Sequence, residues 1–459
     1  IELNPDFVET YSNLSIALWF FKPREFSDSL AKNYLDILNF AAIVRPSSLV
    51  GSIITLLKHH DTIEEAIYRN KQNTLKESVS EFCIRLSEIP LFLKIIEVSP
   101  LPDIEIEEVL TELRRILLLE RNKLSTNDDL LLFQISLALQ CFTNEFIYEE
   151  TEEETIAIQS LEVSLQKSFS NNEELSSYDI VCLASYRSLF DYQWAANITP
   201  PSALELLFKR QVIEVKQERL LRKSIPRLNA IEDDVSLAVQ SQYEENPYPR
   251  WRYANKSVIA NFFLHLNSEI KPNYIKFNNN FLNPNVLIAG CGTGQQLVNA
   301  IGYQNSTIIG VDLSLTSLAY AKRKIDELGA KNVELIQGDI LHLKNLNKKF
   351  DVIECGGVLH HMNEPLEGLK VLLDLLEPHG FLKLGLYSEI SRKHIVKIRE
   401  FIKNKKFKNS ENDIRNCREA VLKQRDDNSL HKIIHNYDFY SISGTRDLIF
   451  HVQEHRFTI

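Results

Sequence analysis

The stretch Asn285-Val-Leu-Ile-Ala-Gly-Cys-Gly-Thr-Gly-Gln-Gln296 decides the fold of this 459-residue chain. A short apolar run at 286–289 has the length of a buried strand, three glycines follow within five residues, and the text then becomes helical. Glycines let a backbone turn sharply and approach a ligand closely, and the N-terminus of the following helix offers free N–H groups. The pattern therefore predicts a strand, a ligand-binding turn and a helix, with a nucleotide-like ligand.

Further along, short β-branched or apolar runs alternate with helical stretches at 307–311, 333–336, 351–354 and 381–386. Strands separated by helices of this length form right-handed crossovers and a parallel sheet. We therefore predict an α/β fold, a Rossmann-like doubly wound sheet, preceded by a large all-helical region.

The residues that follow the first three strands suit a nucleoside ligand. A dinucleotide fingerprint needs glycine at position 295, where this chain has Gln295, so NAD is disfavoured. Asp312 ends the second predicted strand, where a carboxylate can accept hydrogen bonds from both ribose hydroxyls; the alternative is a helix N-cap. Gly338 and Asp339 follow the third strand, and in isolation they would indicate only a turn.

The loop Gly290-Cys-Gly-Thr-Gly294, with Asp312 and Gly338-Asp-Ile340, resembles the cofactor motifs of class I S-adenosylmethionine-dependent methyltransferases. The resemblance implies S-adenosylmethionine as cofactor and S-adenosylhomocysteine as product. It also implies that Asp339 lies near the adenine amino group and that the loop after the fourth strand faces the reactive methyl. The cofactor-binding residues expected on this basis are Gly290, Cys291, Gly292, Thr293, Gly294, Asp312, Leu313, Ser314, Gly338, Asp339, Ile340, Cys355 and Gly356.

Three further stretches, Tyr243-Glu-Glu-Asn-Pro-Tyr-Pro-Arg-Trp251, Leu384-Gly-Leu-Tyr-Ser388 and the text from Asp438 to Phe457, resemble bacterial tetratricopeptide-linked methyltransferases. The helical middle and the composition resemble the rickettsial protein-lysine methyltransferases that modify outer membrane protein B. That resemblance implies a cytoplasmic homodimer that methylates lysines of a surface protein before its export.

Composition divides the chain. Gly51 is the only glycine before Gly290, and residues 1–250 carry 24 Lys and Arg against 40 Asp and Glu, whereas residues 251–459 carry 28 against 22. We expect a remnant of a tetratricopeptide-type repeat at 1–20, a helical substrate-binding and dimerisation region at 21–240, and a methyltransferase domain at 241–459 with a helical insertion at about 389–434. The acidic run 149–154 suits a solvated helix start, or alternatively a basic substrate.

Methyl transfer to lysine needs a neutral amine in a dry site, because the ordinary lysine pKa of about 10.4 keeps the side chain protonated. A carboxylate could assist deprotonation, and aromatic rings could pack on a methylated ammonium. The candidates for these catalytic roles are Glu354, Tyr387, Asp438, Tyr440 and Trp251. For each one, core packing or a surface hydrogen bond is the alternative. One of His360 and His361 could act as a base, or both could pack at a helix start.

Other classes are disfavoured. A net charge of −10 argues against nucleic acid as the main partner, although the run 403–408 is basic. Six scattered cysteines indicate reduced thiols, and no stretch of 18 apolar residues predicts membrane insertion. His451-Val-Gln-Glu-His455 matches an inverted zinc-protease motif, but only four residues follow it, so we expect no metal. Two alternatives stay open: a small-molecule or lipid methyltransferase, and a non-catalytic scaffold with a vestigial cofactor site.

Overall fold

The computed structural model describes residues 8–39, 44–124, 127–253, 258–276, 281–424 and 432–458. The chain divides into two compact units. The helical unit comprises residues 1–216, 251–253 and 402–445, and the sheet unit comprises residues 217–250, 254–401 and 446–459. The segment 402–445 thus groups with the helical residues, whereas the sequence analysis placed it with the methyltransferase domain. Of the predicted repeat remnant, residues 1–7 lie outside the described residues.

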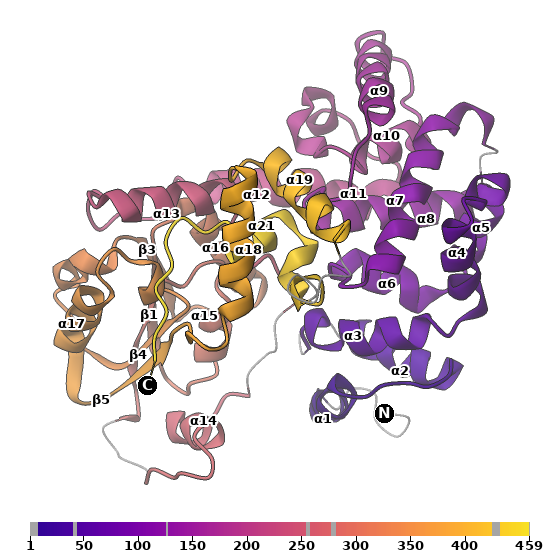
Figure 1. The fold of residues 1–459 in the computed structure, drawn as a ribbon. Helices are drawn as coiled ribbons and strands as arrows, with labels where there is room; N and C mark the ends of the chain where they lie inside the picture. The colour runs from indigo at the N-terminus through magenta and orange to yellow at the C-terminus, as the bar shows by residue number, and fades with distance from the viewer. Residues whose placement is uncertain are drawn as a thin grey trace. The chain divides into compact units, whose positions relative to one another are not determined.

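The helical unit consists of helices and short turns, as the near absence of glycine predicted (Figure 1). Pro46 begins one helix and Pro90 another, because proline suits the first helical turn, where its missing N–H is not needed. The helices described here are α1 (Val8–Trp19), α2 (Asp28–Asn39), α3 (Pro46–Leu57), α4 (Asp61–Lys71), α5 (Val79–Ser87), α6 (Pro90–Val98), α7 (Ile104–Leu119), α8 (Asp128–Thr143), α9 (Glu152–Ser170), α10 (Ser177–Ala184), α11 (Glu205–Phe208), the π-helix η6 (Lys209–Ile213), α19 (Glu411–Leu422) and the 3-10 helix η10 (Tyr437–Tyr440).

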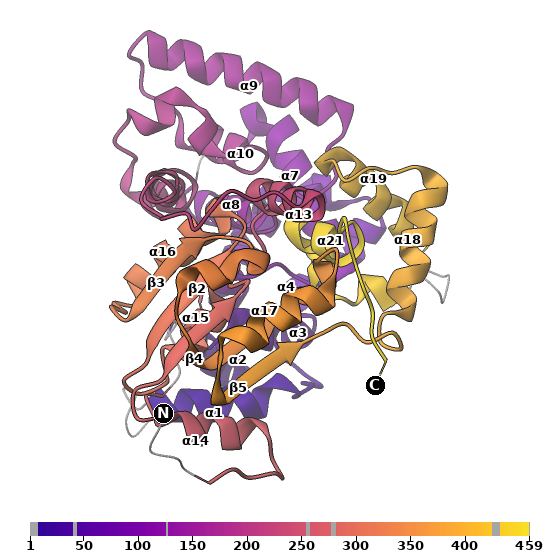
Figure 2. The same ribbon diagram turned by 90° about the vertical axis from the view of Figure 1, so that its left-hand side faces the viewer.

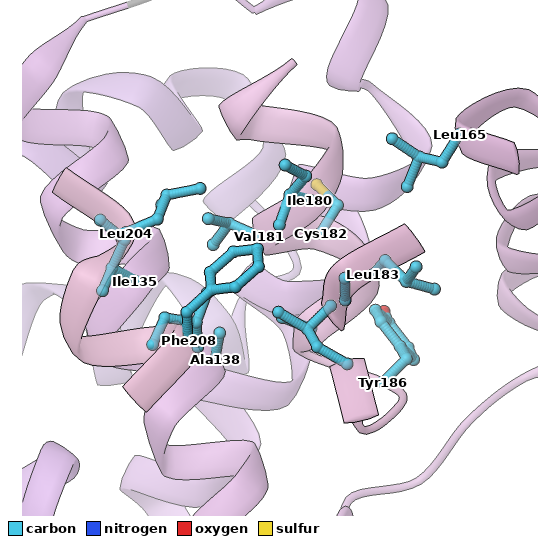
Figure 3. Packing of buried hydrophobic residues seen from close by; sticks show 14 of the residues in the cluster. Ile135, Ala138, Leu165, Ile180, Val181, Cys182, Leu183, Tyr186, Leu204 and Phe208 are labelled. Carbon is cyan, nitrogen blue, oxygen red and sulfur yellow. The ribbon is translucent and has the colours of Figure 1, made fainter. Parts of the chain in front are cut away.

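A core of buried apolar side chains holds α8 and α10 against the segment that contains α11 (Figure 3). Val181 and Phe208 lie in the middle of the labelled side chains, and Trp194, which belongs to the same cluster, is fully buried. The acidic run 149–154 begins α9, where Thr151 and Glu154 form a capping box. The sequence predicted a solvated helix start here. A helix does start here, but Glu154 is buried rather than solvated and accepts a hydrogen bond from the Tyr186 hydroxyl.

The sheet unit contains five parallel strands in the order β3-β2-β1-β4-β5. They are β1 (Asn285–Ala289), β2 (Thr307–Asp312), β3 (Val333–Gln337), β4 (Phe350–Gly356) and β5 (Leu376–Gly385). The predicted doubly wound sheet is confirmed. The last strand begins five residues earlier than expected, directly after the preceding helix, and Figure 2 shows it at one edge of the sheet.

Alternate residues of β1 point to opposite faces of the sheet. Val286 and Ile288 pack on the side of α14 (Phe262–Glu269), α15 (Gln295–Ala300) and α16 (Leu315–Glu327). Leu287 and Ala289 pack on the side of η8 (Ile340–Leu346), η9 (Leu359–His361) and α17 (Pro365–Leu375). The central strands are therefore buried on both faces, as a parallel sheet requires.

Segments outside the sheet complete this unit. Before α13 (Asp234–Glu245), an extended piece pairs with the end of β3, where the Gln337 N–H donates to the Pro226 carbonyl over 2.8 Å. The helices α12 (Glu214–Leu221), α18 (Lys393–Lys405) and α21 (Ile442–Ile449) complete the described elements used below.

All six cysteines are buried, and none is in a disulfide in the described residues. In the described parts of the chain, we find no helix that is both long and apolar enough to span a bilayer.

Candidate functional site

The loop after β1 has a backbone that only glycine adopts easily. Gly290 has φ of 74° and Gly294 has φ of 92°, both in the left-handed region. A Cβ on Gly290 would lie 2.3 Å from Cγ2 of Val358, and one on Gly294 would lie 2.9 Å from Cβ of Ala321. The glycine loop therefore packs closely between α16 and the loop that follows β4, residues 357–358, which we call the β4 exit loop. The helix α15 begins directly after the glycine loop.

Asp312 joins the loops that follow β1 and β2. Its Oδ2 accepts a hydrogen bond from the Gly292 N–H over 2.8 Å, and its Oδ1 accepts one from the Ser314 N–H over 2.9 Å. Burial raises the pKa of Asp312 to about 6, although these two N–H groups lower it. The carboxylate that the sequence analysis assigned to the ribose thus lies beside the glycine loop.

Asp339 carries the clearest sign of a ligand. Its Oδ1 accepts from the Leu341 N–H over 3.0 Å and so caps η8. Its Oδ2 is buried and has no hydrogen-bond partner among the described residues. Since buried polar atoms are nearly always paired, this oxygen fits a donor that arrives with the ligand, such as the amino group of adenine. The Gly338 N–H also donates to the Asp312 carbonyl, which brings the third loop beside the second.

The segment after α13 crosses the glycine loop, which sequence reasoning missed. In this segment, residues 246–250, the Pro249 carbonyl accepts from the Thr293 hydroxyl over 2.5 Å. Within α13 itself, the Tyr243 carbonyl accepts from the hydroxyl of Ser314, which follows β2, over 3.0 Å. This segment entered the sequence analysis only as part of a resemblance. Its two prolines, which keep it extended rather than helical, were the available signal of a covering strap.

The β4 exit loop contributes backbone rather than reactive side chains. Burial raises the pKa of the Cys355 thiol to about 12, and it raises that of Cys291 far above its usual range. Both thiols are therefore protonated at neutral pH and are not nucleophiles. The Gly356 carbonyl accepts from Nε2 of Gln296 over 2.9 Å, a bond that ties α15 to this loop. Leu313 directly follows Asp312 at the end of β2, and Ile340 directly follows Asp339 as the first residue of η8.

The five catalytic candidates do not lie together in one unit. Trp251, Asp438 and Tyr440 belong to the helical unit, where the Tyr440 hydroxyl donates to the Ile434 carbonyl over 2.7 Å. Glu354 belongs to the sheet unit, and its side chain is buried on the α14 side of the sheet.

In the sheet unit, Glu354 accepts a 2.6 Å hydrogen bond from the Tyr303 hydroxyl, and burial raises its pKa. Tyr387 stacks against His360, with ring centres 3.7 Å apart, and its ring also contacts the Arg392 guanidinium at 3.9 Å. These contacts give both residues a packing role, and their catalytic roles stay predictions.

The histidines near the β4 exit are neutral. Burial lowers the pKa of His360 to about 3 and that of His361 to about 4. The pKa of His451 falls to about 2 for the same reason. The inverted zinc-protease motif does not converge, because Glu454 pairs with Arg392 and the His455 ring bonds the Gln453 amide.

Comparison with known proteins agrees with this geometry. Residues 283–436 match the family model described as a methyltransferase domain. Over 188 residues the chain is 30% identical to an uncharacterised protein of Synechococcus, covering 38% of this chain and 42% of that protein. Over 149 residues it is 34% identical to an uncharacterised protein of Rickettsia prowazekii, covering 30% of this chain and 54% of that protein.

Among solved structures, PKMT2 from Rickettsia typhi aligns with a TM-score of 0.33 and 27% identity, over 38% of this chain and 36% of that one. The chain spans about half, or less, of the length of the curated relatives named above. The methyltransferase-domain match falls on the sheet whose first loops hold three convergent glycines, Asp312 and an unpartnered oxygen of Asp339. The chain therefore contains a class I methyltransferase domain whose cofactor is S-adenosylmethionine.

Proposed function

We propose that this chain transfers methyl groups from S-adenosylmethionine to lysine side chains of a protein. The observation that carries the proposal is the joining of a methyltransferase domain to a strongly acidic helical unit. Residues 101–200 alone carry 19 Asp and Glu against 6 Lys and Arg. A surface of one sign raises the local concentration of oppositely charged partners, so this unit suits a lysine-rich substrate.

A cavity in the helical unit is suited to dock such a substrate. Its volume is about 630 Å³, and α7 and α19 supply most of its lining. Its charged lining consists of five glutamates and three cations: Glu107, Glu108, Glu112, Glu149 and Glu419, with Arg415, Arg418 and Lys423. Partial burial and the neighbouring Glu419 raise the pKa of Glu149, as expected when carboxylates gather. A lysine side chain placed here would relieve that repulsion, so we assign the cavity to docking.

The sheet unit supplies the reaction site in this proposal. When bound, the cofactor supplies an electrophilic methyl on a positively charged sulfur. The residues of this chain hold and orient it: Asp312 accepts from the ribose hydroxyls, Asp339 Oδ2 accepts from the adenine amino group, and the glycine loop allows close approach. The strap, the extended residues 246–250 after α13, helps to exclude water, which favours a neutral amine. Glu354, Tyr387, Asp438, Tyr440 and Trp251 stay our candidates for contacts with the amine.

The experiment uses the purified chain, S-adenosylmethionine with a tritiated methyl group, and a bacterial lysate. We expect label in one or a few protein bands, and methyl-lysine after acid hydrolysis. The Asp312→Ala variant is the control for enzyme-dependent label. Label confined to lipid or small molecules would overturn the protein substrate, and absence of label in every fraction would favour a non-catalytic scaffold.

From the resemblance we further propose a homodimer that acts in the cytoplasm on a surface protein. Sedimentation velocity tests the assembly, because a dimer has twice the 53.1 kDa mass of the chain. A single species at the monomer mass across micromolar concentrations would contradict it.

A further inference from the structure

The side chain of Gln296 carries a buried oxygen that no protein group uses. Gln296 is the second residue of α15, and its Nε2 donates to the Gly356 carbonyl at the end of β4 over 2.9 Å. Its Oε1 is buried and has no hydrogen-bond partner among the described residues. A reversed amide would set Oε1 against the carbonyl oxygen of Gly356, so the hydrogen bond fixes which atom of Gln296 stays unpaired.

Close packing at the end of β4 keeps this amide in place. A Cβ on Gly356 would lie 2.9 Å from Nε2 of Gln296, and a Cβ on Gly385 would lie 3.1 Å from Cα of Gly356. Only glycine at these two positions leaves room for the contact. Since buried acceptors are nearly always paired, the Oε1 of Gln296 fits a donor that arrives with a ligand.

The order of the strands indicates which part of the ligand this is. Along β3, β2, β1 and β4, the carboxyl ends carry in turn Asp339, Asp312, the glycine loop and Gly356. With adenine assigned to Asp339 and the ribose to Asp312, the rest of the cofactor extends toward β1 and β4. Three strand spacings separate β3 from β4, about 14 Å, which is comparable with the extended length of S-adenosylmethionine.

We propose that Oε1 of Gln296 accepts a hydrogen bond from the ammonium group at the amino-acid end of S-adenosylmethionine. An ammonium group only donates hydrogen bonds, whereas the neighbouring carboxylate of the cofactor only accepts them. The Nε2 donor of Gln296 is already bound to Gly356, so this side chain suits the ammonium and not the carboxylate. Gln296 thereby positions the amino-acid end of the cofactor and favours ligands that carry the amine.

Sequence reasoning gave Gln296 no role, because the expected cofactor residues of this loop ended at Gly294. The signal lies in the structure, where the end of β4 binds one half of the amide and leaves the other half unpaired. The inference rests on the cofactor and not on the nature of the methyl acceptor. It holds whether or not the substrate is a protein.

The test is isothermal titration calorimetry of the full chain with ligands that differ only at the amino-acid end. These are S-adenosylhomocysteine, its decarboxylated analogue, its deaminated analogue and methylthioadenosine. Gln296→Met keeps the length of the side chain and removes the acceptor. The affinity for the two ligands with an amine should fall by about 10- to 100-fold, as expected for a hydrogen bond to a charged group, while the other two should change by less than about twofold.

Two further variants separate this contact from a structural role. Gln296→Glu keeps an acceptor but loses the donor to Gly356, so it should retain most of the affinity for S-adenosylhomocysteine. Asp339→Asn should weaken all four ligands alike, because each one carries adenine. Far-ultraviolet circular dichroism confirms that each variant is folded.

The proposal is overturned if Gln296→Met leaves the affinity for S-adenosylhomocysteine unchanged. It is also overturned if Gln296→Met weakens methylthioadenosine as strongly as S-adenosylhomocysteine, because Gln296 would then act only by holding the end of β4. Failure of the parent chain to bind S-adenosylhomocysteine would overturn the cofactor assignment as well. A methyl acceptor other than protein lysine would change none of these affinities, so the proposed function is tested separately.

Discussion

The carboxylate of Asp312 bridges two loops while its pKa is raised to about 6 by burial. Since the ribose hydroxyls need an ionised acceptor, we expect S-adenosylmethionine affinity to fall by up to about tenfold per pH unit below pH 6. Isothermal titration calorimetry at pH 5.0, 6.0 and 8.0 measures this. Asp312→Ala should abolish binding at every pH.

The fold itself should survive in this pH range. The pKa of Asp312 is higher in the folded chain than its ordinary value of about 3.9, so its protonation favours the folded chain as the pH falls from 6 to 4. An affinity that stays flat between pH 8 and 5 would refute the role of the ionised carboxylate.

A substitution at Gly294 tests whether the loop after β1 is packed too closely against α16 to accept a side chain. We expect Gly294→Ala to lower both cofactor affinity and the free energy of unfolding, because the new methyl would lie 2.9 Å from Cβ of Ala321. Gly329 is the matched control, since it also has a left-handed φ, of 68°, but its added Cβ would meet nothing within 4 Å. Gly329→Ala should cost only the backbone strain, about 1 kcal/mol, in urea unfolding. Equal losses would show that the contact with Ala321 is unimportant.

The glycine loop and Asp312 could be predicted because their signals are local: glycine spacing after an apolar run, and an acid at the end of the next strand. Residues such as Tyr243 and Gln296 gave no such signal. Their partners come from distant segments, and a single sequence does not say which segments meet. The same limit explains why the strap over the loop was missed.

Between α7 and α19, a buried ion pair holds two helices that the sequence analysis assigned to different domains. Arg418 binds the Glu107 carboxylate with two hydrogen bonds of 2.5 Å. Arg418→Ala would leave Glu107 buried without its cation, so we expect a loss of about 3–5 kcal/mol in the free energy of unfolding. Chemical denaturation measures it.

The exposed pair of Lys370 and Glu367 on α17 is the control for that variant. Lys370→Ala should leave the unfolding midpoint unchanged, because an exposed pair is screened by water. If Arg418→Ala also left the free energy of unfolding unchanged, the buried ion pair would not be the interaction that holds α19 against α7.

The start of strand β5 could not be predicted correctly from the sequence. The expected strand started at residue 381, where the apolar run begins, but the structure starts it at Leu376 and includes Pro378. An edge strand tolerates proline because its outward N–H needs no partner. The other four strands were close to their expected ranges. For the three inner strands, β1, β2 and β4, burial on both faces makes the apolar runs continuous.

At the scale of the whole molecule, the two units have different proposed roles: the acidic helical unit docks the substrate, and the sheet unit binds the cofactor. If the acidic helical unit docks lysine-rich protein, the KM for that protein should rise severalfold between 50 and 500 mM NaCl, because salt screens exposed charges. The dissociation constant of the cofactor should change little. Radiolabel transfer at several substrate concentrations measures the first, and calorimetry measures the second.

Substitution separates docking from general salt effects. Glu149→Gln with Glu419→Gln removes two charges of the cavity and should raise KM with kcat nearly unchanged. A KM that is insensitive to both salt and these substitutions would place docking elsewhere.

The domain boundaries could be predicted only in part at this scale. The change in glycine and charge placed the start of the methyltransferase domain at residue 241, whereas the compact sheet unit begins at residue 217. Composition did not reveal that residues 402–445 pack with the helices, since a polar helical segment suits either unit.

Each unit contains buried cysteines, so the reaction of these thiols can show when that unit opens. Cys83, Cys141, Cys182 and Cys417 lie in the helical unit, and Cys291 and Cys355 lie in the sheet unit. A thiol-modifying reagent can reach them only when the surrounding structure opens, so the order in which they become alkylated gives the order in which the two units unfold. Peptide mapping after timed alkylation would therefore follow the local opening of the helical unit and the sheet unit in one unlabelled, unmutated sample.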